Sequence, residues 1–138
     1  FRYAIKQHGG MLAKGRLLGI QFEQLLKGGD DCLYFGLARH ANAMAKKIRK
    51  AFENKGIEMW IDSPTNMQFP LLTKEQQAIL GEKFVPEFWG KYDGERDIVR
   101  FCTSWATKPE NVESLCYGIT REGIHSTAIA SLFIAETL

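Results

Sequence analysis

The chain has 138 residues, of which 45% are hydrophobic and 25% are charged, a composition typical of a globular protein with one core. Its 18 basic and 16 acidic residues leave a formal net charge of +2, which gives no general reason to expect a nucleic-acid or membrane partner. No apolar run approaches the roughly 20 residues that a membrane-spanning helix needs. We therefore expect one domain and neither kind of partner.

The cysteines favour a reducing, cytoplasmic location. Cys32, Cys102 and Cys116 are widely spaced and include no CxxC pair, so neither a disulfide framework nor a zinc site is indicated. The histidines show no metal-ligand spacing either, and we expect no metal. The chain begins at Phe1 rather than at a methionine, without a secretory leader, which indicates a fragment or a processed product.

Two helices are expected first. An apolar stripe beginning at Met11 stops at Gly28-Gly29, a pair that commonly ends a helix. After an aspartate cap, a second stripe continues at helical spacing from Leu33 to about Asn54.

A mixed α/β block follows these helices. Alternation and aromatic content predict strands over residues 57–61, 67–71, 84–89 and 97–105. Thr73 and Thr107 each stand three residues before a glutamine or glutamate, the spacing of a capping box, and predict two short helices. The fold class is therefore α/β (α+β), with a small antiparallel sheet covered by helices.

Arg100 lies in the middle of the strand predicted over 97–105. Alternation places Val99, Phe101, Thr103 and Trp105 on a core face, and Arg100 on the other face with Ile98 and Cys102. A guanidinium within a β-rich layer needs an anion or water. That partner is either an internal carboxylate or a ligand carboxylate held by the planar fork of donors. Cys102 is interpreted as a small buried thiol rather than a nucleophile.

A basic, glycine-rich segment stands before the first long helix. It contains Lys6, Lys14 and Arg16 among several glycines. Such a segment could offer positive charge and backbone amides to a phosphate. Its spacing matches neither the P-loop nor the dinucleotide fingerprint, so an ordinary loop and helix start is the alternative.

Three stretches of the chain resemble the C-terminal part of the threonine aldolase and aromatic amino-acid β-eliminating lyase family. They are residues 1–22, Asp62-Ser63-Pro64-Thr65-Asn66, and residues 98–107, which read IVRFCTSWAT. The resemblance covers residues 1 to about 115. It implies a fold, namely the small C-terminal domain of a fold-type I pyridoxal-phosphate enzyme, preceded by a long interdomain helix. It also implies a lyase activity. The lyase would cleave β-hydroxy amino acids such as threonine to glycine and an aldehyde, or would eliminate the side chain of an aromatic amino acid.

The resemblance also implies roles for particular residues. Arg100 matches the arginine that binds the substrate carboxylate, and Lys14, Arg16 and Lys6 match the segment that reaches the cofactor phosphate. The lysine that forms the Schiff base belongs to the upstream large domain, so no catalytic residue is expected in this chain. We therefore expect it to be inactive alone, to need the missing cofactor domain, and to form a homo-oligomer in the complete enzyme.

The expected organisation has three parts. Residues 1–29 form the phosphate-reaching segment and interdomain helix, residues 30–118 form the small α/β domain, and residues 119–138 are an apolar tail that departs from the family pattern. A competing hypothesis is a non-catalytic α/β binding or interaction module that keeps Arg100 and never meets a cofactor domain.

Overall fold

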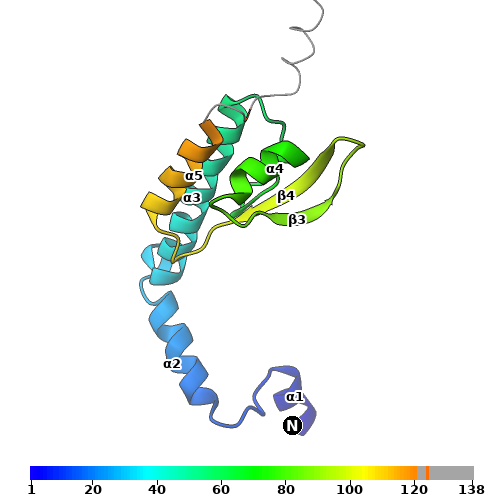
Figure 1. The fold of residues 1–138 in the computed structure, drawn as a ribbon. Helices are drawn as coiled ribbons and strands as arrows, with labels where there is room; N and C mark the ends of the chain where they lie inside the picture. Colours follow the sequence, from blue (N-terminus) through cyan, green and yellow to red (C-terminus); the bar gives the residue numbers. More distant parts are fainter. Residues whose placement is uncertain (121–123, 125–138) are drawn as a thin grey trace, which may run out of the picture. The chain divides into compact units, whose positions relative to one another are not determined.

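The computed structural model describes residues 1–120 and Ile124, in two compact units (Figure 1). The first unit is Phe1–Leu37, and the second begins at Ala38. The predicted boundary after residue 29 stays a prediction, and most of the predicted apolar tail lies outside the described residues. Within the described part, no helix combines the length and apolar character needed to cross a membrane.

The first unit contains two complete helices, one turn of 3-10 helix and the start of a third helix. Helix α1 spans Arg2–Gln7, α2 spans Gly15–Leu26, and the 3-10 turn η1 spans Gly29–Asp31. Helix α1 was not expected from the apolar pattern. The predicted stop is confirmed, because α2 ends before Gly28, whose φ of 109° suits a residue without a side chain.

Helix α3 spans Leu33–Asn54 and carries one face of the main core. Its buried positions include Met44, Ile48 and Phe52, which recur at the spacing of one helix face. They pack with residues of helix α5, Pro109–Thr120, and α3 and α5 lie side by side in Figure 1. The second predicted helix is therefore confirmed almost to the residue.

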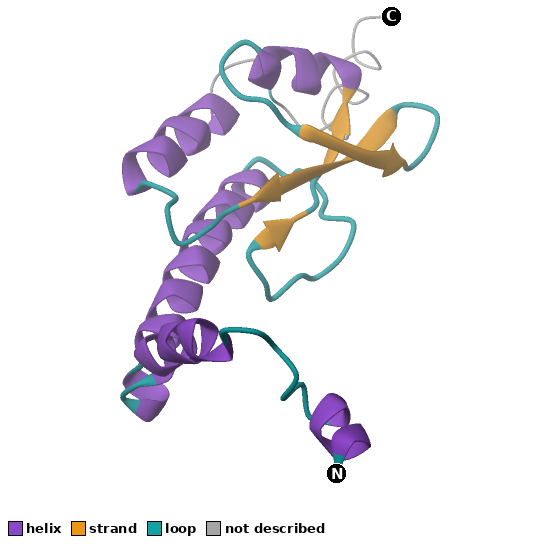
Figure 2. Ribbon diagram, turned by 90° about the horizontal axis from the view of Figure 1, so that it is seen from below, coloured by secondary structure: helices purple, strands orange, loops and turns teal. Residues whose placement is uncertain are grey.

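The sheet is four-stranded and antiparallel, and β4 is its central strand (Figure 2). Strand β4, Arg96–Cys102, pairs with β1, Met67–Gln68, with β2, Leu71–Thr73, and with β3, Glu87–Lys91. Helix α4, Lys74–Gly81, begins with the predicted capping box, whose two hydrogen bonds between Thr73 and Gln76 are both formed. The predicted fold class is confirmed.

Prolines explain two differences from the predicted strands. Residues 57–61 form only an isolated bridge between Met59 and Pro70. The strand predicted over 67–71 is divided into β1 and β2, because the Pro70 carbonyl accepts from the Val99 N–H of β4 but Pro70 has no N–H to donate in return. The aromatic strand begins at Glu87, after Pro86, rather than at Phe84. The Phe84 N–H is instead used at the end of α4, where it donates to the Leu80 carbonyl at 2.9 Å.

Two further predictions near the end of β4 are wrong. Trp105 is 68% exposed, because the strand ends at Cys102 and alternation no longer applies beyond it. The capping box at Thr107 does not form. The Thr107 hydroxyl instead accepts a 2.8 Å hydrogen bond from the Ser104 N–H, a local bond that competes with capping.

A buried carboxylate joins β4 to α4. Asp97 is 4% exposed and accepts hydrogen bonds from Lys74 Nζ and from Gln77 Nε2, the latter at 2.9 Å. The hydrogen bond from Lys74 is the largest cause that lowers the pKa of Asp97, ahead of the bond from Gln77. The charged form of Asp97 therefore stabilises the fold.

We expect Asp97→Asn to lower the free energy of unfolding at pH 7 by roughly 1 kcal/mol. A depressed folded-state pKa gives stability that is present above the unfolded pKa and is lost as pH falls through the folded pKa. The difference between wild type and Asp97→Asn should therefore shrink below about pH 4. Urea unfolding at several pH values measures it, and a difference that is constant from pH 7 to pH 2 would contradict the assignment.

Candidate functional site

Arg100 lies on the face of β4 that points away from the main core. Its neighbours Val99 and Phe101 are buried in that core, as the alternation predicts. Glu87 stands directly opposite Arg100 on β3. Glu87 Oε2 accepts hydrogen bonds from Arg100 Nε, at 2.9 Å, and from Nη2. The bond to Glu87 is the main cause that raises the pKa of Arg100, so an internal carboxylate supplies the anion that Arg100 requires.

An aromatic row continues from Arg100 across this face of the sheet. The Arg100 guanidinium lies over the Trp89 ring, 4.6 Å from its centroid. Trp89 meets Phe69 edge to face at 5.6 Å, and Phe69 meets Trp60 in the same way at 5.9 Å. The β3 ladder shifts register between Phe88 and Gly90, the residues that flank Trp89. We call Trp60, Phe69 and Trp89 the aromatic row.

Arg96 provides an internal comparison for Arg100. The two side chains share one face of β4 by alternation, have similar exposures of 26% and 23%, and each lies over an aromatic ring. Asp93 Oδ2 contacts Arg96 Nε at 2.9 Å and Nη2 at 2.8 Å, and Glu58 Oε2 accepts from Nη1 at 3.0 Å. All three nitrogens of Arg96 are therefore engaged.

Arg100 differs from Arg96 in one respect. Its Nη1 makes no hydrogen bond to any of the described residues, because Glu87 contacts only Nε and Nη2. A guanidinium can bind a second carboxylate through its outer pair of N–H groups. Arg100 is thus held by one internal carboxylate and can still bind another, so the two alternatives raised by the sequence are compatible.

The predicted phosphate-binding residues all lie in the first unit. Lys14 is the N-cap residue of α2 and has a φ of 57°. No side-chain cap accepts from the free backbone N–H groups of the first turn, and this turn contains no acidic residue. Lys14, Arg16 and Lys6 are partly or wholly exposed and form no ion pair with the described residues. Free cations beside unsatisfied helix amides are suited to an anion such as phosphate.

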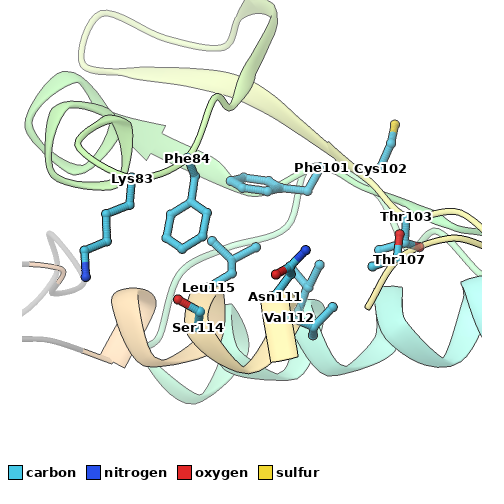
Figure 3. A pocket seen from close by; sticks show the side chains of 11 residues that line it. Lys83, Phe84, Phe101, Cys102, Thr103, Thr107, Asn111, Val112, Ser114 and Leu115 are labelled. Carbon is cyan, nitrogen blue, oxygen red and sulfur yellow. The ribbon is translucent and has the colours of Figure 1, made fainter. Parts of the chain in front are cut away.

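A cavity in the second unit does not include Arg100 in its lining. It has a volume of about 410 Å³ and is lined mainly by α5 and by residues of α3, β4 and the end of α4. Figure 3 shows Phe84, Phe101 and Leu115 along its wall, with the Cys102 thiol directed away from them. No group of metal-binding side chains occurs in the described part of the chain. The Arg100 face is taken as the candidate site because the family resemblance assigns the substrate carboxylate to Arg100.

A solved structure shows what this chain is similar to. Threonine aldolase from Leishmania major is 37% identical to it, with a TM-score of 0.72 over 84% of this chain. The chain belongs to the threonine aldolase family. It spans 33% of the length of the Leishmania major protein and corresponds to the C-terminal part of the family. No family model and no curated protein matches it.

Sequence reasoning missed two partners of the arginine that the threonine aldolase resemblance singles out. From the sequence, Glu87 and Trp89 are predicted only to lie in an aromatic strand. A signal for Glu87 existed, since it and Arg100 flank the Asp93-Gly94 turn and a hairpin places such positions opposite each other. The register shift beside Trp89 had no such signal, because Gly90 alone does not specify a bulge.

Cys102 should react first among the three cysteines with a thiol reagent. It is exposed at the end of β4, so the prediction of a buried thiol is wrong. Cys32 is buried, and burial raises the pKa of the Cys116 thiol. Peptide mass spectrometry after brief iodoacetamide treatment at pH 7.5 measures the order of labelling. Cys102→Ser should remove the fast phase. Earlier labelling of Cys32 or Cys116 would contradict the described burial.

Proposed function

We propose that the chain is the C-terminal portion of a pyridoxal-phosphate-dependent lyase that cleaves β-hydroxy amino acids such as threonine to glycine and an aldehyde. The observation that carries the proposal is the state of Arg100. In a chain 37% identical to a threonine aldolase, this arginine is held by Glu87 and keeps Nη1 available. Its position on a strand suits the binding of a substrate carboxylate.

Arg100 would contribute orientation as well as affinity. When both oxygens of a substrate carboxylate are bound by a planar fork, rotation of the substrate about the bond between Cα and its nitrogen is restricted. The bond between Cα and Cβ can then stand perpendicular to the cofactor ring. Pyridoxal phosphate, when bound, supplies the electron sink for cleavage of that bond. By orienting the substrate, Arg100 would determine which bond to Cα stands perpendicular to the cofactor ring.

The first unit would supply the contacts to the cofactor phosphate. Lys14 and Arg16 stand at the start of α2 beside its unsatisfied amides, and Lys6 lies at the end of α1. A dianionic phosphate is attracted both by the positive end of a helix dipole and by lysine and arginine side chains. These residues favour a role for the first unit in binding the cofactor phosphate. This role is proposed independently of the position of the first unit relative to Arg100.

The remaining partners belong to the same proposal. The lysine that carries the cofactor would come from a large domain that is not in this chain, and assembly would be a homo-oligomer in the cytoplasm. The competing module hypothesis has one observation in its favour, because Glu87 already neutralises Arg100. Activity of the complete enzyme distinguishes the two hypotheses.

Arg100→Ala in the complete enzyme should lower kcat/KM for threonine by about one to two powers of ten, because charge-assisted hydrogen bonds to the carboxylate are lost. The absorbance of the bound cofactor should not change. Arg96→Gln is the matched control and should stay near wild type, since Arg96 is fully engaged within the chain. Steady-state kinetics measure both variants, and an unchanged kcat/KM for Arg100→Ala would remove Arg100 from the site.

The chain by itself should form no stoichiometric lysine adduct with pyridoxal phosphate. We base this expectation on the family resemblance, which places the cofactor lysine upstream of Phe1. Equimolar pyridoxal phosphate followed by borohydride and intact-mass measurement gives the result. A single lysine modified to near completion, at Lys6 or Lys14 for example, would contradict the assignment of these side chains to the phosphate alone.

A further inference from the structure

The guanidinium of Arg100 has two edges that can each bind a carboxylate. The inner edge consists of Nε and one hydrogen of Nη2, and the outer edge consists of Nη1 and the other hydrogen of Nη2. Glu87 Oε2 occupies the inner edge, with 2.9 Å to Nε. The outer edge is therefore the part of Arg100 that remains for a ligand.

Two contacts fix the direction of this outer edge. Glu87 is the direct cross-strand neighbour of Arg100. The two side chains of the ion pair therefore extend from backbones that the β3–β4 pairing holds in place. The Trp89 ring lies 4.6 Å from the guanidinium carbon and supports the plane of the group from one side. A side chain with several rotatable bonds is thereby restrained before any ligand arrives.

Arg96 shows what a purely internal arginine looks like in the same strand. Asp93 occupies its inner edge and Glu58 contacts Nη1 at 3.0 Å. At Arg100 the inner contact is kept and the outer contact is missing. The two arginines thus differ at the edge that a substrate would use, and they agree in the contacts that hold the side chain.

We propose that Glu87 is a positioning residue, which holds Arg100 against Trp89 so that the outer edge of the guanidinium binds a ligand carboxylate. The identity of that ligand as an amino-acid substrate rests on the proposed function. Glu87 does not touch the substrate in this scheme, and its effect passes entirely through Arg100. Preorganisation lowers the entropic cost of binding and aligns the substrate for the reaction.

The opposite role for Glu87 gives an opposite result. If Glu87 competed with the substrate carboxylate for the same donors, its removal would free Arg100 and increase kcat/KM. If Glu87 only stabilised the hairpin of β3 and β4, its removal would act equally with or without Arg100. A double-mutant cycle separates all three roles.

The first experiment measures kcat/KM for threonine in the complete enzyme. We expect Glu87→Gln, which keeps the shape and removes the charge, to lower kcat/KM about tenfold. In the Arg100→Ala background, Glu87→Gln should cause no further loss. Asp93→Asn, the matching change at Arg96, should stay within about twofold of wild type. An increase, no change, or an equal loss in both backgrounds would overturn the proposal.

The second experiment uses the 138-residue chain and needs no activity. In proton–nitrogen NMR spectra, the Arg100 Nε–H should exchange slowly with water in wild type and at least tenfold faster in Glu87→Gln. The Arg96 Nε–H should be unchanged. An unaltered exchange rate of the Arg100 Nε–H would show that Glu87 does not hold Arg100 in place, and would refute the proposal. An inactive wild-type enzyme would instead refute the proposed function, so the two failures are distinguishable.

Discussion

The antiparallel pairing of β4 with each of the other strands is the constraint on which the rest of the fold depends. Because successive side chains of a strand point to opposite faces, this single segment separates two environments. Val99 and Phe101 face the helices and join the main core, whereas Arg100 faces the aromatic row. A shift of one residue in the register would bury the arginine and expose the core.

The elements with a strong local signal were predicted well. Helix α3 has a regular apolar face and α4 has a capping box, and both form because local preference and tertiary packing agree. The errors occur where a backbone group finds a different partner. Pro70 divides the strand predicted over 67–71 because it has no N–H to donate to β4, and the Thr107 hydroxyl bonds to Ser104 instead of capping a helix. Such choices depend on neighbours that a local pattern does not contain.

The candidate site shows the same division. Arg100 was predictable, because a charge within an apolar alternating strand is unusual and the family resemblance marks it. Glu87 and Trp89 were not predicted, since their roles follow from the β3 register and its shift beside Trp89. The sequence indicates which residue needs a partner. The fold determines which partner is within reach, and how many of the donors that partner uses.

Strand β4 uses two ionisable residues in contrasting ways. Asp97 is buried, and its carboxylate accepts from Lys74 and Gln77, so that its charge links the sheet to α4. Arg100 is partly exposed and keeps one edge unbonded within the described chain. A buried charge must be fully compensated, whereas a partly exposed one can keep unused donors in contact with water. The unused edge of Arg100 therefore costs little in the folded chain, and it suits a group whose partner arrives from outside.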